Sequence, residues 1–150
     1  MSTETYLYQE IQLNLVKEHK DVERYQVVSS YSAYDYLLPL YGSDIEIREH
    51  FIALFLNNNN QVIGHYRLST GGITGTVVDV RLLFATALKA LAVGVIISHN
   101  HPSGKVKPSD ADIQITKKIK EAGKLLDIHL LDHLIVTDVS YLSFADDGIL

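Results

Sequence analysis

Residues 93–112 read VGVIISHNHPSGKVKPSDAD, and this stretch decides the fold. Its β-branched apolar start is typical of a strand buried on both faces of a sheet. Side chains two residues apart on a strand point the same way, so His99 and His101 share one side and Asn100 faces the other. Pro102 disfavours helical backbone for the residue before it and keeps His101 extended. The sequence therefore predicts two convergent imidazoles at the end of a buried strand.

A helix is predicted over residues 109–125. Ser109 is a good N-cap, and aspartates in the first turn suit the exposed amides and the positive end of the helix dipole. The Ser109-x-x-Asp112 spacing is close to a capping box, but Asp112 also begins an inward stripe, where a carboxylate needs a partner charge or a cation. The stripe consists of Asp112, Ile115, Ile119, Ala122 and Leu126, opposite an outer face of Lys117, Lys118, Lys120, Glu121 and Lys124.

Two imidazoles and one carboxylate form a typical catalytic zinc site, because they leave the fourth position open for a water molecule. Zinc lowers the pKa of such a water to about 7 and polarises a carbonyl group. Non-haem iron also uses two histidines and a carboxylate, so Fe²⁺ stays open as the lesser alternative. We expect one Zn²⁺ per chain, bound by His99, His101 and Asp112.

The pattern HxHPxxxxxxSxxD over residues 99–112 is similar to the JAMM signature of the MPN/JAB domain metalloproteases. The flanking sequence resembles the RadC branch of that family, and the likeness extends over residues 46–150. It implies an α/β JAB/MPN fold, similar to that of cytidine deaminases, with three layers and a mixed central sheet flanked by helices. The segments that carry the likeness are Arg48 to Phe51, Ile96 to Gly104, Glu121 to Leu126 and Leu131 to Val136.

The resemblance also implies two catalytic residues. A glutamate at the start of an upstream strand acts in the family as general base and proton shuttle, and Glu49 is the match. From the residues alone, Glu46 and His50 are equally plausible. The serine of the motif, here Ser109, donates a hydrogen bond to the tetrahedral intermediate in the family.

Two weaker candidates remain. The pair Asp132 and His133 is either a second shell that orients a ligand imidazole or a hydrogen-bonded core feature. A catalytic triad with Ser98 or Ser103 is disfavoured, because adjacent residues of one strand point to opposite faces. Residues 71–76 are rich in glycine but lack the lysine and the spacing of a phosphate-binding loop, so they predict a connection able to move beside the metal site.

The hydrophobic pattern predicts further elements around the motif. Strands are expected over residues 49–56 and 62–68, joined by a hairpin turn at Asn57 to Asn60, and Asp79 is expected to cap a helix. In the first strand, alternation places Glu49, Phe51, Ala53 and Phe55 on one face.

We expect two parts in the chain: an N-terminal extension over residues 1–45 and the RadC-type domain over residues 46–150. Within the extension, the residue pattern predicts a strand over Tyr6 to Val16 and a second at Val27-Val28. It also predicts a helix over 33–41 that Ser32 caps and Gly42 ends. The extension either packs on the domain or pairs two copies as a homodimer. It leaves no room for the helix-hairpin-helix DNA-binding region of longer RadC-type proteins, which weakens a DNA-repair role.

The composition sets the outer bounds. A chain of 150 residues, 47% hydrophobic and 21% charged, has enough material for one core. It contains no cysteine, which excludes disulfides and thiolate ligands and agrees with a reducing cytoplasm, where we expect the protein to act. No signal peptide or membrane span is visible. The net charge of -5 argues against a general nucleic-acid surface, although a local one stays open around Lys105, Lys107, Lys117, Lys118, Lys120 and Lys124.

Three functions follow as hypotheses. The first is a zinc-dependent hydrolase, a metallopeptidase or isopeptidase acting on a peptide or protein substrate. The second is a DNA-associated protein with nuclease or repair-accessory activity that uses the lysine cluster to bind phosphates. The third is a binding module in which the metal only stabilises the fold.

Overall fold

The computed structural model describes residues 23–72 and 77–150 and contains one mixed sheet. Its strand order is β2-β1-β3-β4-β5, in which only the β3–β4 pair is parallel. The strands are β1 (His50–Leu56), β2 (Val62–Thr70), β3 (Gly94–Asn100), β4 (His129–Val136) and β5 (Tyr141–Ser143). The helices are α1 (Ser30–Tyr41), α2 (Val80–Lys89), α3 (Asp110–Leu125) and the short 3-10 helix η1 (Gly42–Asp44).

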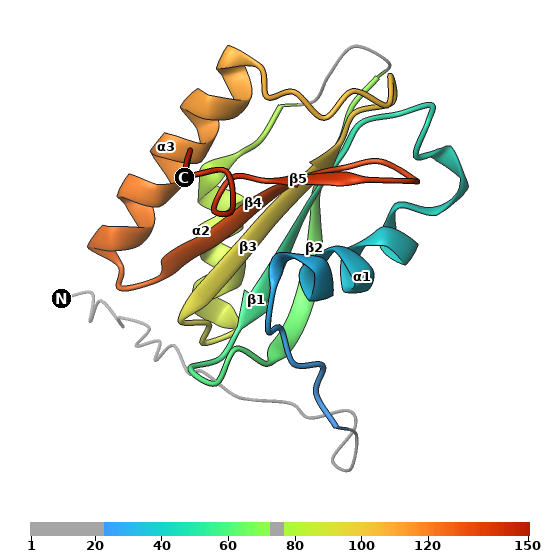
Figure 1. Cartoon of the computed structure of the whole chain (residues 1–150). Helices are drawn as coiled ribbons and strands as arrows, with labels where there is room; N and C mark the ends of the chain where they lie inside the picture. Colours follow the sequence, from blue (N-terminus) through green and yellow to red (C-terminus); the bar gives the residue numbers. More distant parts are fainter. Residues whose placement is uncertain (1–22, 73–76) are drawn as a thin grey trace, which may run out of the picture.

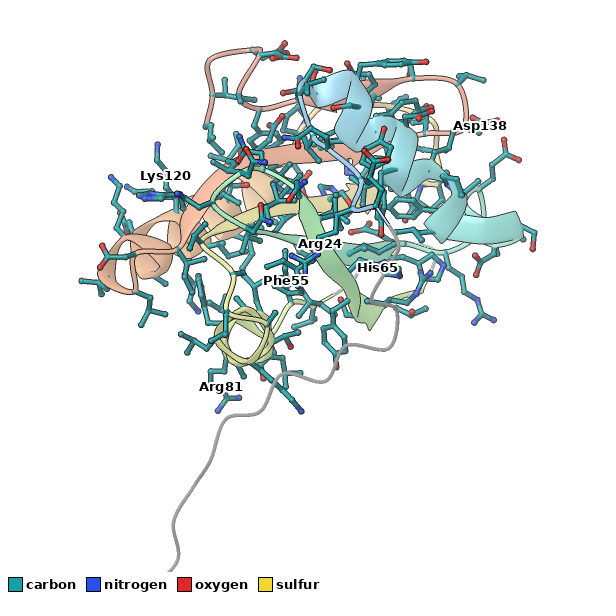
Figure 2. The ribbon with its side chains drawn as sticks, turned by 90° about the horizontal axis from the view of Figure 1, so that it is seen from below. Arg24, Phe55, His65, Arg81, Lys120 and Asp138 are labelled. Carbon is teal, nitrogen blue, oxygen red and sulfur yellow. The ribbon has the colours of Figure 1, made fainter. Side chains whose placement is uncertain are left out.

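The helices cover both faces of the sheet, which confirms the expected three-layer α/β architecture (Figure 1). The view from below shows α1 and α2 on opposite sides, with Phe55 on the α2 side and Arg81 extending from α2 into solvent (Figure 2). Both central strands, β1 and β3, are buried along their whole length. The apolar run in front of the two histidines is therefore the buried strand that the sequence predicts.

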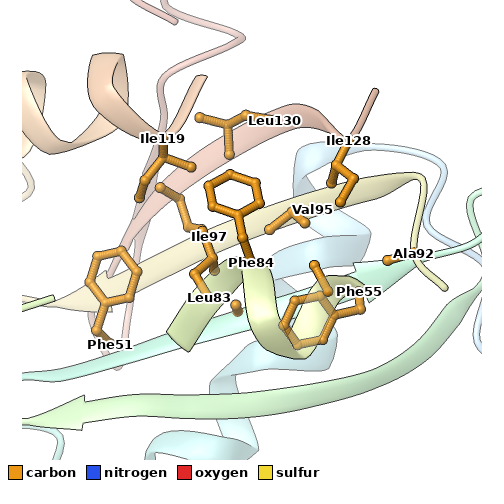
Figure 3. Close-up of a cluster of buried hydrophobic side chains, with 12 residues drawn as sticks. Phe51, Phe55, Leu83, Phe84, Ala92, Val95, Ile97, Ile119, Ile128 and Leu130 are labelled. Atoms are coloured by element: carbon orange, nitrogen blue, oxygen red, sulfur yellow. The ribbon is translucent and has the colours of Figure 1, made fainter. Parts of the chain in front are cut away.

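One core cluster fills the space between the sheet and the pair α2 and α3 (Figure 3). Phe51, Ala53 and Phe55 of β1 all belong to this cluster, which confirms that they share one face of the strand. Complete burial of such side chains stabilises the fold by about 1.5–3 kcal/mol each. The cluster consists of Phe51, Ala53, Phe55, Leu83, Phe84, Ala87, Ala92, Val95, Ile97, Ile119, Ile128 and Leu130.

The second core cluster lies between the other face of the sheet and α1. The intervening residues of β1 and β3 point into it, so each central strand contributes to both clusters. Tyr41, at the end of α1, is 1% exposed, and its hydroxyl lies 2.6 Å from Ser98 Oγ. The cluster consists of Ala33, Tyr34, Leu37, Tyr41, Ile52, Leu54, Leu56, Val62, Ile96, Leu134 and Val136.

A bulge in β4 decides which way its polar residues face. Val95 of β3 lies opposite Leu130, but the next residue, Ile96, lies opposite Asp132, so Leu131 is an extra residue. Asp132 consequently points to the α1 side of the sheet, and His133 points to the side of α2 and α3. The alternation expected for this pair is confirmed.

The N-terminal part differs from its prediction in detail. Helix α1 begins at Ser30, because Ser29 is the N-cap and Ser32, the expected cap, completes a capping box with it. Gly42 ends the helix, as predicted, with a φ of 70°. Val27-Val28 is not a strand: Val28 is 79% exposed, and this segment has only one isolated bridge, at Gln26. The strand expected over Tyr6 to Val16 lies outside the described residues.

The other predicted elements are present with small shifts. Strand β2 continues to Thr70, two residues beyond its expected end. The turn at residues 57–60 is confirmed, with Asn60 at a φ of 55°. Asp79 caps α2 and Ser109 caps α3, as predicted. Leu126 is not part of the inward face of α3, because the helix ends at Leu125 and Leu126 is its 43% exposed C-cap.

Candidate metal centre

The residues predicted to bind metal come together between the end of β3 and the first turn of α3. Figure 1 shows the course of the chain from β3 to α3. His99 belongs to β3 and is 1% exposed, and His101 follows the strand end, with its Nε2 atom 2.9 Å from that of His99. Asp112 lies in the first turn of α3. Its Oδ1 is 3.2 Å from His99 Nε2, and its Oδ2 is 3.3 Å from His101 Nε2.

The hydrogen bonds outside this cluster define which nitrogen of His101 faces inward. Its Nδ1 lies 2.7 Å from the carbonyl oxygen of Lys105, which can only accept, so Nδ1 carries a proton and donates it. In the neutral ring, the lone pair on Nε2 then points toward His99 and Asp112. Electron-rich atoms therefore converge at this point, an arrangement that requires a cation or a proton between them.

The spacing of these atoms fits a zinc ion. Zinc binds histidine nitrogen and carboxylate oxygen at about 2.0–2.1 Å, which places neighbouring ligand atoms of a tetrahedral site roughly 3.3 Å apart. The three contacts of 2.9, 3.2 and 3.3 Å approach that value. His99, His101 and Asp112 are also the one group among the described residues whose arrangement suits a metal ion. Their donor types suit a transition metal with an open coordination position.

Asp112 is both a cap and a candidate ligand. The Ser109 amide donates to Asp112 Oδ2 at 2.8 Å, and the Asp112 amide donates to Ser109 Oγ at 3.1 Å. This reciprocal pair is a capping box, and it holds the carboxylate in place at the N-terminus of α3. The two interpretations of the Ser109-x-x-Asp112 spacing are therefore compatible in one geometry.

The electrostatics of the cluster favour an ionised carboxylate. Burial alone raises the pKa of Asp112, but the hydrogen bonds that His101 and His99 donate when protonated on Nε2 outweigh burial and hold the pKa well below its ordinary range. The same bond to Asp112 raises the pKa of His101 against the opposing effect of burial. The site thus presents a fixed negative charge to whatever cation it binds.

Glu49 lies directly before β1, and the strand register places it beside the cluster. Phe51 pairs with His99 across the antiparallel β1–β3 ladder, so continuing this register by two residues brings Glu49 opposite His101. Alternation puts its side chain on the same face as Phe51. Burial raises the pKa of Glu49, and the charges of His99 and His101 oppose that shift only in part. A carboxylate with a raised pKa suits proton transfer near neutral pH.

Asn100 connects the segment that carries Glu49 to the end of β3. Its Oδ1 accepts a hydrogen bond from the amide of His50 at 2.7 Å, and its Nδ2 donates to the carbonyls of Ile45 and Arg48 at 2.6 and 2.7 Å. The side chain is fully buried and uses both amide protons and its oxygen. The sequence predicted that Asn100 faces away from the two histidines, but its role was missed. The signal for that role is that a buried side-chain amide needs hydrogen-bond partners.

His50, the alternative to Glu49, faces away from the cluster. Its ring nitrogens contact Asp44 Oδ1 at 2.9 Å and Thr70 Oγ1 at 3.0 Å. The ring therefore joins η1 to the end of β2 and faces the same side as Asn100. The side chain of Glu46, the other alternative, lies in an exposed part of the loop.

His133 packs directly behind the cluster and is fully buried. Its Nε2 lies 2.8 Å from His99 Nδ1, so His133 contacts the imidazole of a candidate ligand. Burial lowers the pKa of His133 well below its ordinary value, and its ring is neutral. Phe51 stacks on His99 and Phe144 stacks on His133, which fixes both ring planes.

Asp132 does not belong to this group. Its carboxylate accepts hydrogen bonds from Ser143 Oγ at 2.6 Å and from the Ala145 amide at 3.0 Å, on the other side of the sheet. Ser98 likewise contacts Tyr41 on that side. The disfavoured triad is therefore not assembled. Asp132 instead anchors the C-terminal segment to β4.

The glycine-rich connection is described only in part. The amide of Glu49 donates to the carbonyl of Gly72 at 3.4 Å, and the amide of Gly71 donates to the carbonyl of Glu49 at 2.8 Å. The start of the connection thus lies beside Glu49, while residues 73–76, and with them the expected movement, lie outside the described part. Within residues 23–72 and 77–150, no helix is long and apolar enough to cross a membrane.

Comparison with known proteins identifies the family. The family model of the RadC-like JAB domain matches residues 27–149. The chain belongs to this family. The RadC-like JAB match includes α1 together with the whole sheet and all three candidate ligands.

Curated relatives carry the name UPF0758 protein, which states no activity. A relative in Flavobacterium johnsoniae is 53% identical over 125 residues, covering 83% of this chain and 53% of that protein. Relatives in Chlorobaculum tepidum and Porphyromonas gingivalis are 43% and 41% identical over 105 and 128 residues, covering 70% and 85% of this chain and 47% and 56% of those proteins. The chain therefore spans about half the length of the curated relatives that it matches.

Proposed function

We propose that this RadC-like JAB domain is a zinc-dependent hydrolase of the JAMM type that cleaves peptide or isopeptide bonds. The observation that carries the proposal is the convergence of His99 Nε2, His101 Nε2 and the ionised Asp112 carboxylate within 3.3 Å of one another. The outward hydrogen bond of His101 and the capping box of Asp112 hold two of these ligands before any metal binds.

The chain supplies the proton chemistry. Zinc, when bound, supplies a Lewis acid that polarises a carbonyl group and lowers the pKa of water. Glu49, beside the ligands and with a raised pKa, takes a proton from the attacking water and returns it to the leaving amine. Ser109 Oγ accepts from the Asp112 amide, and its own proton is free to stabilise developing negative charge on the substrate oxygen.

Metal analysis tests the first half of this proposal. The purified protein should contain about one zinc per chain, measured by inductively coupled plasma mass spectrometry. Asp112→Asn should lose the metal, because the substitution removes the charge that offsets the cation. The proposal fails if the wild-type protein binds neither Zn²⁺ nor Fe²⁺ while folded.

Hydrolysis tests the second half. Glu49→Gln should retain zinc and lose cleavage of a peptide and isopeptide library, whereas Glu46→Gln, which changes an exposed glutamate of the same loop, should retain both. Equal cleavage by Glu49→Gln and wild type would remove Glu49 from the mechanism. A wild-type protein that contains zinc but cleaves nothing would favour a metal-stabilised binding module.

The partner of this site is proposed to be a protein or peptide. A DNA-associated role is the alternative that the lysines around the motif leave open, and salt-dependent DNA affinity lost in Lys105→Ala and Lys107→Ala would support it. A homodimer built through the N-terminal part is the proposed assembly, to be measured by sedimentation.

A further inference from the structure

A chain of short contacts connects two candidate metal ligands through the core. His99 Nδ1 lies 2.8 Å from His133 Nε2, and His133 Nδ1 lies 2.6 Å from Thr116 Oγ1. Thr116 Oγ1 in turn lies 2.6 Å from the backbone carbonyl oxygen of Asp112. Strands β3 and β4 and helix α3 each contribute to this chain, and His99, His133 and Thr116 are at most 3% exposed.

One arrangement of protons satisfies all three of these contacts. The carbonyl oxygen of Asp112 can only accept, so the one hydroxyl proton of Thr116 points to it. Thr116 Oγ1 must then accept from His133, which places a proton on Nδ1. The His133 ring is fully buried, stacks on Phe144 and hydrogen-bonds no carboxylate of the described residues, so it carries this one proton and its Nε2 is bare. His133 Nε2 accepts from His99, whose proton is therefore on Nδ1.

The consequence falls on the other nitrogen of His99. With Nδ1 protonated, the neutral ring has its lone pair on Nε2, the atom that faces His101 and Asp112. His101 reaches the same state by a different partner, the carbonyl of Lys105. A backbone carbonyl thus fixes the tautomer of each ring. The carbonyl of Lys105 acts on His101 directly, and that of Asp112 acts on His99 through Thr116 and His133.

We propose that His133 and Thr116 are positioning residues, which fix the tautomer of His99 and so prepare its Nε2 for the metal. This inference rests on the proposed metal function, but its core is a statement about proton positions that holds without metal. Thr116 has a second effect, because its bond to the Asp112 backbone couples the orientation of one ligand to the helix turn that carries another.

The proton positions can be measured directly in the metal-free protein. Long-range ¹⁵N–¹H correlation spectra distinguish a protonated ring nitrogen from a bare one. We expect His133 with a protonated Nδ1 and a bare Nε2, and His99 with a protonated Nδ1. A proton on His133 Nε2 would overturn the inference whether or not the protein binds zinc.

A pair of variants tests the effect on metal binding. Thr116→Val keeps the branched shape of the side chain but leaves His133 Nδ1 without its acceptor, and Thr116→Ser keeps the hydroxyl. Zinc affinity, measured by competition with a chromophoric chelator, should fall about 10- to 100-fold in Thr116→Val and stay near the wild-type value in Thr116→Ser. The ¹⁵N spectrum of Thr116→Val should also show His133 protonated on Nε2.

Three outcomes separate the inference from the proposed function. Absence of zinc binding in the wild type refutes the proposed function, and the tautomer spectra still decide the proton chain. Equal zinc affinity in wild type, Thr116→Val and Thr116→Ser refutes the positioning role while the metal site stands. If Thr116→Val does not fold, the tautomer of wild-type His133 decides the inference.

Discussion

The side chain of Asn100 holds the backbone of His50, with the amide of His50 donating to Asn100 Oδ1 at 2.7 Å. Together with its bonds to Ile45 and Arg48, this contact fixes the segment on which Glu49 sits. Asn100 itself lies between two candidate metal ligands in sequence, but its side chain is on the opposite side of the strand. One side chain thus connects the end of β3 to the segment that carries the proposed base.

Asn100→Ala should separate metal binding from hydrolysis. Loss of three buried hydrogen bonds lowers the free energy of unfolding by about 2–3 kcal/mol and releases Glu49 from its position, while the ligands keep their own partners. Zinc content should stay near one per chain and cleavage should fall at least tenfold. Asn58→Ala, in the exposed turn, is the control. Parallel loss of zinc and cleavage in Asn100→Ala would show that Asn100 supports the whole site.

Ser109 can be tested for its two roles by two substitutions that remove the same hydroxyl. Alanine at an N-cap costs about 1 kcal/mol of unfolding free energy and glycine only a few tenths, as urea denaturation would measure. If the hydroxyl proton stabilises negative charge on the substrate, Ser109→Ala and Ser109→Gly should lose cleavage equally. If cleavage instead falls more in Ser109→Ala than in Ser109→Gly, in parallel with stability, Ser109 has the capping role alone.

Gly123 marks where α3 packs most tightly on the chain that follows it. A Cβ at this position would lie 2.2 Å from the carbonyl oxygen of Ile128, a backbone atom that cannot move aside alone. Gly123→Ala should therefore lower the free energy of unfolding by about 2 kcal/mol or more, despite the better helix propensity of alanine. Gly64→Ala, where nothing lies within 4 Å, should change it by less than about 0.5 kcal/mol. Equal midpoints in urea would contradict this packing.

Asp132 makes stability depend on pH with a defined sign. Burial raises its pKa in the folded protein, so the folded state binds more protons than the unfolded state between the ordinary pKa of 3.8 and the raised one. The contribution of Asp132 to stability is therefore complete below that window and falls as pH rises through it. With chelator present, urea denaturation from pH 4 to 7 should show wild type losing stability relative to Asp132→Asn. A constant difference in stability between wild type and Asp132→Asn over this range would contradict the assignment.

The convergence of His99, His101 and Asp112 was predictable because the position of each depends on local geometry. Alternation along β3 orients His99 and His101, and helical periodicity orients Asp112, so the spacing in the sequence carries the geometry. The same holds for the cap at Ser109. None of these inferences required knowledge of which strands are neighbours.

The parts that the residues alone left open depend on pairing between distant segments. Glu49 reaches the cluster only through the register of β1 against β3, and Glu46 or His50 would serve equally without it. The contact of His133 requires both the parallel β3–β4 pair and the bulge at Leu131. Thr116 was missed because the partner of its hydroxyl, the His133 ring, belongs to a distant strand.

The described contacts give the Glu49 side chain no structural task. Only its backbone pairs with Gly71 and Gly72, and any residue can supply those groups. The candidate ligands, in contrast, contact one another and are held by Lys105, Ser109 and His133. The proposed activity and the architecture are therefore separable within this fold: a single change at position 49 is expected to remove the proposed proton shuttle and to leave the stability of the protein and its candidate metal site intact.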